Sequence, residues 1–169
     1  MNEAPFRIVR LGPGHDRAAF DCGSDPLNLY LREQVTQDIR RHVTFCFVAL
    51  AEEGRIAGFY TLASASFLTS DLPDNIRRKL PRYPTVPAVR LGRLAVDNSF
   101  KGQGLGGALL ADALTRAVHS DIASYAMIVE AKDAEASAFY RHYGFIAFPD
   151  KPLILFLPLA TVRSLGLSH

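Results

Sequence analysis

Four glycines lie close together near the middle of the chain, at Gly102, Gly104, Gly106 and Gly107. A compact run of β-branched and large apolar residues precedes them, and an alanine- and leucine-rich run follows. This pattern predicts a buried strand, a short turn and the start of a helix. Glycine lets the backbone approach a ligand closely, and the N–H groups of a helix's first turn point toward that ligand. The segment is therefore predicted to bind a phosphate group.

Two common phosphate-binding patterns fit this loop poorly. The Walker A pattern needs Lys-Ser/Thr after its glycines, whereas alanine follows Gly107, so that pattern is excluded. The dinucleotide pattern G-x-G-x-x-G occurs at Gly102, Gly104 and Gly107, but that fingerprint begins directly after a strand in an all-parallel unit. Here the polar residues 97–101 intervene, and the strands before them are predicted to form an antiparallel hairpin.

Hydrophobic periodicity and turn residues predict the elements that position the loop. In order, we expect strand 6–11, helix 26–41, strands 43–50 and 55–67, a short helix 70–80, an extended segment 81–87, a strand to about 96, helix 105–118, strand 125–131, helix 134–142 and strand 152–157. This order predicts an α/β fold with a mixed central β-sheet. The N-terminal part is antiparallel, and a parallel pair lies around the glycine loop. No linker or repeat interrupts the chain, so residues 1–169 are predicted to form a single domain.

Composition narrows the possible environments and partners. Lysine and arginine total 19 against 17 acidic residues, a net charge of +2, which is too small to indicate nucleic-acid binding by the protein as a whole. No apolar run approaches the ~20 residues of a membrane span, and the N-terminus lacks the apolar core of a signal peptide. We therefore expect a soluble cytoplasmic protein with no membrane association. Cys22 and Cys46 are predicted to be reduced apolar side chains, and no metal-binding spacing is present.

Two segments resemble the GCN5-related N-acetyltransferase (GNAT) family. Residues 101–106, Lys-Gly-Gln-Gly-Leu-Gly, resemble its coenzyme A loop, Q/R-x-x-G-x-G/A, with Lys101 as a conservative departure. Residues 133–145 resemble a second family motif, N-x-x-A-x-x-F-Y-x-x-x-G-F, with Asp133 where asparagine is usual. The resemblance implies the GNAT fold and an N-acetyltransferase that takes acetyl from acetyl-CoA, without a metal. A diphosphate also needs several convergent N–H donors, which the loop supplies.

The resemblance further implies roles for single residues. The family's pantetheine arm runs beside the strand before the loop, and its tyrosine in the F-Y pair often protonates the departing thiolate. The predicted catalytic residue is therefore Tyr140, whose alternative role is that of an aromatic residue packed under the cofactor. Lys101 has the alternative role of an ordinary solvated lysine. The predicted cofactor-binding residues are Leu94, Ala95, Val96, Lys101, Gly102, Gln103, Gly104, Leu105, Gly106, Gly107, Asp133 and Phe139.

The segment 80–97 looks like the acetyltransferase toxins of bacterial type II toxin–antitoxin systems, as do residues 20–23 and 58–62. This second resemblance implies that the acceptor is the α-amine of aminoacyl-tRNA. It also implies a small ribbon-helix-helix antitoxin as partner and a homodimer. An arginine in so apolar a strand as 89–96 needs a cleft or a partner. The predicted substrate-binding residues are Arg77, Arg78, Arg90 and Arg93, and the alternative for the first two is a solvated helix face balanced by nearby acids.

The sequence is also compatible with two other functions. The same cofactor loop could serve an acetyltransferase for small-molecule amines or protein N-termini, which would need no tRNA. It could also belong to a non-catalytic module that binds coenzyme A and acts through partners. No general base stands out, and an α-amine with a reference pKa of about 7.7–8.0 needs none, because a substantial fraction is already neutral.

Overall fold

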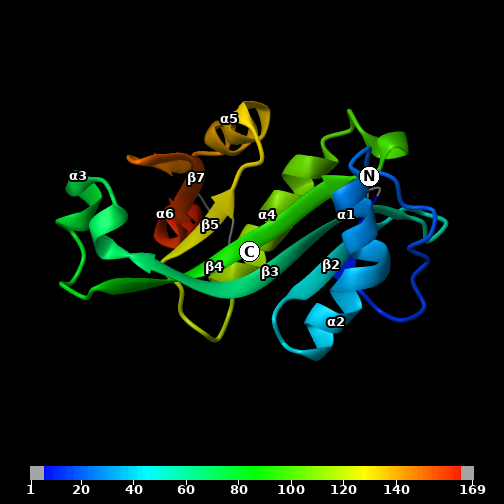
Figure 1. The fold of residues 1–169 in the computed structure, drawn as a ribbon, viewed down its shortest axis with the longest axis horizontal. Coiled ribbons are helices and arrows are strands. Elements are labelled where there is room, and N and C mark those ends of the chain that lie inside the picture. Colours follow the sequence, from blue (N-terminus) through cyan, green and yellow to red (C-terminus); the bar gives the residue numbers. More distant parts are fainter. Residues whose placement is uncertain (1–5, 165–169) are drawn as a thin grey trace. The chain divides into compact units, whose positions relative to one another are not determined.

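The computed structural model describes residues 6–164, and its strands form one mixed sheet in the order β1-β2-β3-β4-β5-β7-β6 (Figure 1). The strands are β1 (Arg7–Arg10), β2 (Phe45–Leu50), β3 (Ile56–Leu68), β4 (Thr85–Val96), β5 (Ala126–Glu130), β6 (Ile146–Phe148) and β7 (Lys151–Pro158). The helices are α1 (Asp25–Leu29), α2 (Val35–Arg40), α3 (Asp74–Arg77), α4 (Leu105–Val118), α5 (Ala134–His142) and α6 (Leu159–Ser164).

Strand pairing has the predicted change of direction. β1 pairs antiparallel with β2, and β2 pairs antiparallel with β3. β4 pairs with β5 in parallel, with Ala88 opposite Ala126 and Leu91 opposite Val129. Parallel neighbours need a crossover connection, and α4 provides it between these two strands. β7 then pairs antiparallel with both β5 and β6. The predicted α/β fold with a mixed sheet is confirmed.

The chain divides into two compact units. The first unit comprises the residues up to Ala63 together with Gly92–Ala113, and the second comprises Ser64–Leu91 together with the residues from Leu114 onward. β3, β4 and α4 each begin in one unit and end in the other. That residues 1–169 form a single domain stays a prediction.

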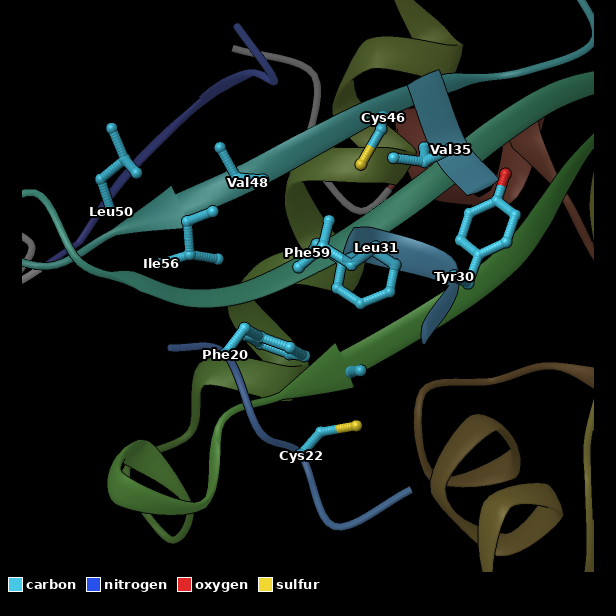
Figure 2. Close-up of a cluster of buried hydrophobic side chains, with 11 residues drawn as sticks. Phe20, Cys22, Tyr30, Leu31, Val35, Cys46, Val48, Leu50, Ile56 and Phe59 are labelled. Atoms are coloured by element: carbon cyan, nitrogen blue, oxygen red, sulfur yellow. The ribbon is translucent and has the colours of Figure 1, made fainter. Parts of the chain in front are cut away.

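The core of the first unit lies under the helical segment 25–40 (Figure 2). Its buried side chains Tyr30, Leu31 and Val35 pack with Cys46 and Phe59 of the sheet. The segment is the predicted single helix with a π-helical turn, Tyr30–Gln34, inserted between α1 and α2. Both cysteines of the chain are free and buried, and burial raises the pKa of the Cys46 thiol to about 12. Cys46 therefore acts as an apolar side chain.

The core of the second unit is built around aromatic rings. Phe67 of β3 lies edge-on to Phe148 of β6, with ring centroids 5.4 Å apart, and Phe148 lies 5.0 Å from Phe156 of β7. The edge-on pair has a favoured geometry for aromatic rings, and both centroid distances lie in the range of attractive aromatic contacts. Because Phe148 is buried among these rings, even the short strand β6 is tied to the sheet.

Several predicted boundaries were wrong. The helix expected over 70–80 is only a 3₁₀ turn, Thr69–Asp71, followed by the single helical turn α3, because Pro73 between them holds an extended conformation. β4 begins at Thr85, inside the segment predicted to precede the strand. Pro87 has no N–H to donate, but its carbonyl takes part in the strand's pairing by accepting a hydrogen bond from the Tyr125 N–H at 2.9 Å. β6 and α6 were not predicted.

Candidate functional site

The glycine loop has the geometry of an anion-binding helix start. Gly102 and Gly104 have φ angles of 81° and 78°, a region that strongly favours glycine, and a Cβ at either position would meet nothing within 4 Å. The N–H of Ala108 donates to the Gly104 carbonyl at 3.1 Å, which is the first turn of α4. The N–H groups of residues 105–107 precede that hydrogen bond, so they have no acceptor within the helix and can bind an anion. The residues fit the diphosphate of coenzyme A.

Close contact between β3, β4 and α4 holds the start of the helix in place. A Cβ on Gly58 would lie 2.9 Å from the Ala95 carbonyl oxygen and 2.9 Å from a methyl carbon of Leu109. Only glycine therefore lets β3 come so near. Leu105 and Leu109 are buried on the same side of α4.

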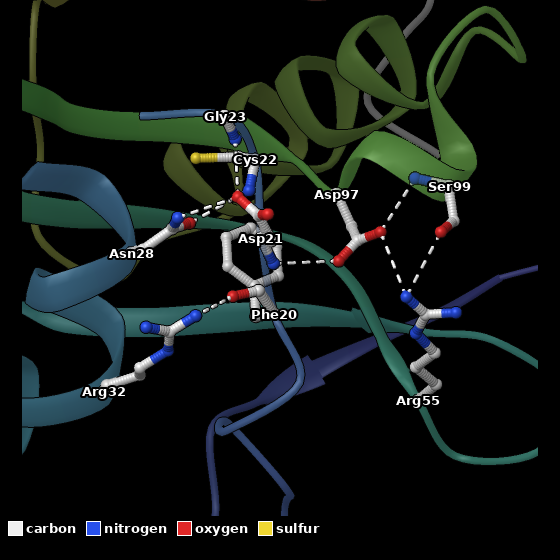
Figure 3. Close-up of polar contacts among 9 residues, drawn as sticks. All are labelled: Phe20, Asp21, Cys22, Gly23, Asn28, Arg32, Arg55, Asp97 and Ser99. Carbon is white, nitrogen blue, oxygen red and sulfur yellow. Dashed lines mark hydrogen bonds and ion pairs between the residues drawn. The ribbon is translucent and has the colours of Figure 1, made fainter. Parts of the chain in front are cut away.

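A buried carboxylate joins the turn before the loop to residues far away in the sequence (Figure 3). Asp97 is only 1% exposed, and its oxygens accept hydrogen bonds from the backbone N–H groups of Asp21, at 3.0 Å, and Ser99, at 2.8 Å. Its Oδ1 also lies 3.3 Å from a guanidinium nitrogen of Arg55. A buried carboxylate needs such partners, and here they fix the path of the chain into the loop.

Segment 20–23 is held by further hydrogen bonds, in addition to its bond to Asp97. The Asp21 carboxylate accepts from the Gly23 N–H and from the Asn28 side-chain amide, both at 2.9 Å, and these two bonds lower its pKa. The Asn28 oxygen in turn accepts from the Cys22 N–H at 2.9 Å. The sequence analysis did not predict these hydrogen bonds. The only indication that this segment matters was the similarity of residues 20–23 to the toxins.

Lys101 has a bonding partner within the protein. Its ammonium group donates to the Cys22 carbonyl at 2.8 Å, so the loop is tied to segment 20–23 a second time. Lys101 is exposed, as the alternative interpretation expects, and it also makes this specific contact within the protein. That Lys101 also contacts the phosphates stays a prediction.

The second family motif forms α5 and the turn after it. Asp133 caps the helix by accepting from the Ala136 N–H at 2.9 Å, which explains why an acid serves where asparagine is usual. Gly144 follows the end of the helix with a φ of 96°, a left-handed conformation that favours glycine. Phe139 is half-buried, and its ring lies edge-on to Tyr140 with centroids 5.2 Å apart.

Tyr140 is 9% exposed and packs against Phe145, with ring centroids 5.5 Å apart. Desolvation raises the pKa of its hydroxyl to about 12. Among residues 6–164 this hydroxyl makes no hydrogen bond, so it is free to donate to a ligand. Tyr140 therefore stays protonated at physiological pH, as a hydrogen-bond donor to a departing thiolate must.

The four predicted substrate arginines differ in their surroundings. The guanidinium carbon of Arg93 lies 3.5 Å from the centroid of the Tyr30 ring, a cation–π contact that supplies the partner expected for an arginine in this strand. Arg77 pairs with Asp74 at 2.6 Å. Arg78 and Arg90 are exposed and have no ion-pair partner in the described part of the chain.

The predicted site residues lie in both units. The first unit holds Arg93, residues 94–96 and the loop 101–107, and the second holds Asp133, Phe139, Tyr140 and the other three arginines. That they form one site stays a prediction. In the range 6–164 no cluster of three or more histidine, cysteine or acidic side chains could hold a metal ion. In the same range no helix is long and apolar enough to span a membrane.

Comparison with known proteins identifies the family. The model of the acetyltransferase (GNAT) domain family matches residues 27–153. A tRNA-acetylating toxin of Mycobacterium tuberculosis is 39% identical over 158 residues, which are 92% of this chain and 93% of the relative.

Two solved structures share the fold. AtaT complexed with acetyl-methionyl-tRNAfMet has a TM-score of 0.88 at 31% identity, covering 95% of this chain and 99% of AtaT. A variant of the AtaT toxin bound to the C-terminus of the antitoxin AtaR and acetyl-CoA has a TM-score of 0.80 at 27% identity, with 96% of this chain and 99% of the other covered. The predicted acetyl-CoA-dependent N-acetyltransferase is confirmed: this chain belongs to the GNAT acetyltransferase family.

Proposed function

We propose that this protein transfers acetyl from acetyl-CoA to the α-amino group of aminoacyl-tRNA and acts as a toxin that blocks translation. The observation that carries the proposal is the 39% identity to a tRNA-acetylating toxin along 92% of the chain. An acetylated α-amine is no longer a nucleophile, so the tRNA's amino acid cannot accept a growing peptide. Since charged tRNA is cytoplasmic, the protein acts in the cytoplasm.

The donor is held by backbone groups. Acetyl-CoA supplies an acetyl group activated as a thioester. The N–H groups at the start of α4 bind its diphosphate, and Gly102 and Gly104 give the backbone the required path. The edge of β4 at Leu94, Ala95 and Val96 supplies backbone groups for the pantetheine amides.

Tyr140 acts on the departing sulfur as a hydrogen-bond donor. A pKa of about 12 lies well above the reference value of about 8.5 for a thiol, so full proton transfer from Tyr140 is uphill. Donation of a hydrogen bond to the developing negative charge needs no such transfer and is strong in a site that excludes water. Tyr140 therefore stabilises the thiolate, and solvent supplies the final proton.

The acceptor needs no dedicated base. The reference pKa of an α-amine is about 7.7–8.0, so a substantial neutral fraction exists near pH 7. We expect the rate to rise with pH through this range and then to level off. The rate should then stay level up to about pH 11, because Tyr140 keeps its proton over this range.

We also propose a ribbon-helix-helix antitoxin as partner and a homodimeric state. The support is the resemblance of residues 80–97 to toxins of such pairs and the AtaT variant bound to the C-terminus of its antitoxin. Light scattering on the purified protein tests the dimer. A small ribbon-helix-helix reading frame next to the gene, and co-purification of its product, test the partner.

Expression in bacteria without the antitoxin tests the function. We expect growth arrest together with N-acetylated aminoacyl-tRNA, detected by mass spectrometry after nuclease digestion. The Tyr140→Phe variant is the matched control and should restore growth at equal protein level. Normal growth of cells making the wild-type protein, with no acetylated tRNA, would contradict the proposal.

A further inference from the structure

A cavity of ≈ 670 Å³ lies in the second unit, between residues 68–70 at the end of β3 and residues 77–84 that lead from α3 to β4. This volume is within the range of about 300–1,000 Å³ that ligand pockets occupy. The described lining residues include three arginines and a tyrosine and no acidic side chain. The cavity therefore has the composition of a site for an anionic ligand.

The two walls of this cavity are fixed to each other. The Thr69 hydroxyl donates to the Tyr83 carbonyl at 2.6 Å, and the Thr69 N–H donates to the Pro84 carbonyl at 3.0 Å. Pro81 and Pro84 restrict the backbone on either side of Tyr83. The backbone that carries Tyr83 is thus held rigidly.

Two of the lining arginines have unpaired charges. Arg77 is partly neutralised by Asp74, at 2.6 Å. Arg78 and Arg82 are exposed, and neither has an ion-pair partner in the described range 6–164. Guanidinium groups in this state are suited to binding phosphates, which they contact through fixed pairs of N–H donors.

The exposed aromatic ring of Tyr83 indicates which kind of anionic ligand the cavity binds. Its side chain is 69% exposed, although its backbone is anchored. An acidic peptide would need only the arginines. A flat exposed ring beside arginines is the arrangement that binds unpaired nucleotides, whose bases stack on the ring while the phosphates meet the cations.

We propose that this cavity binds an unpaired nucleotide at the 3′ end of the acceptor RNA, with its base stacked on Tyr83 and its phosphates on Arg78 and Arg82. The inference rests on the proposed function and names the part of the substrate recognised. The aminoacyl group is attached to the 3′ end of tRNA and that end is single-stranded, so an enzyme acting there meets unpaired bases. Bases within the duplex are stacked on each other and cannot reach the ring.

Binding of uncharged RNA tests the proposal without any chemistry. The probes are two fluorescent RNA hairpins, one with a short single-stranded 3′ overhang and one blunt, titrated by anisotropy over a series of salt concentrations. Tyr83→Ser should weaken binding of the overhang hairpin by about 5- to 100-fold and leave the blunt hairpin unchanged. Arg82→Gln should lower the slope of log K against log salt by about 0.7.

Lys79→Gln is the matched control, because it removes an exposed charge from the same segment but does not line the cavity. It should leave the preference for the overhang intact. Unfolding midpoints of all variants should equal that of the wild type, since each changed side chain is exposed.

The proposal is wrong if Tyr83→Ser binds both hairpins as the wild type does. It is also wrong if Arg82→Gln loses binding of an acidic antitoxin peptide while binding RNA normally, which would make the cavity a protein-binding site. Failure of the proposed function is seen separately. A wild-type protein that acetylates no charged tRNA refutes that function whatever the hairpins show, whereas acetylation combined with normal hairpin binding by the variants refutes only the inference about the cavity.

Discussion

The two units use polar residues in opposite ways. In the first unit the charged groups around the glycine loop have partners inside the protein: Asp97 accepts from two backbone N–H groups and pairs with Arg55, and Lys101 donates to the Cys22 carbonyl. In the second unit the Tyr140 hydroxyl and Arg82 have no hydrogen-bond or ion-pair partner in the described part of the chain. The charged groups of the first unit thus shape the backbone of the glycine loop, whereas Tyr140 and Arg82 of the second unit keep polar groups available for the ligands that we propose.

Removing the hydroxyl of Tyr140 is expected to have the largest effect and tests whether the second unit supplies side chains to the reaction. Tyr140→Phe should lower kcat by about 10²- to 10³-fold, because a hydrogen-bond donor to the leaving group is lost, with the KM for acetyl-CoA unchanged. Steady-state kinetics measure both, and an unaltered unfolding midpoint controls for folding. If the variant kept the wild-type kcat, Tyr140 would have only a packing role.

Asp97 tests the opposite prediction for the first unit. Asp97→Ala leaves two backbone N–H groups without their acceptor and should lower the free energy of unfolding by about 2–4 kcal/mol. Urea unfolding gives the value, and Asp97→Asn, which retains one acceptor oxygen, should lose less. A loss below ~0.5 kcal/mol for Asp97→Ala would show that the carboxylate does not hold the turn.

Burial of Tyr140 also predicts how stability depends on pH. Its pKa is about 12 in the folded protein and ~10 in an unfolded chain, so between these values the unfolded state loses a proton that the folded state keeps. Stability therefore falls as pH rises from 10 to 12, by about 2 kcal/mol from this group. Tyr140→Phe should remove that part of the decline. Identical pH curves for the two proteins would mean that the hydroxyl is solvated.

Backbone conformation at the loop has a smaller and more selective effect. Gly104→Ala places a side chain at a φ of 78°, which costs about 1–2 kcal/mol, and should raise the KM for acetyl-CoA by about 5- to 30-fold with kcat unchanged. Gly54→Ala is the matched control, because Gly54 has a φ of 85° and equally open space but lies in the β2–β3 turn. If both variants raised the KM alike, the effect would come from general strain.

The smallest expected effect concerns Lys101. If its main task is the bond to the Cys22 carbonyl, Lys101→Met should lower stability by about 1 kcal/mol and raise the KM for acetyl-CoA less than about threefold. A larger rise in KM that disappears at high salt would show that the ammonium group binds phosphate directly, as the family resemblance implies.

Local patterns predicted what depends on local physics. The strand, glycine turn and helix from 89 to 118 follow from periodicity and glycine content. Asp133 and Gly144 are of the residue types usual at a helix start and after a helix end. Contacts between distant segments were not predictable. Asp21 and Asp97 are separated by 76 positions, and Arg93 finds Tyr30 only because the helical segment packs onto the sheet. β6 is too short, at three residues, to show an alternation of its own.

The central claim is that the acceptor amine belongs to aminoacyl-tRNA. The most direct test offers the purified protein labelled acetyl-CoA with charged tRNA, uncharged tRNA, the free amino acid amide and a peptide N-terminus in one reaction, followed by nuclease digestion and mass spectrometry. We expect the label as N-acetyl-aminoacyl-adenosine from charged tRNA alone. Label on the free amide or the peptide, with none on charged tRNA, would contradict the account.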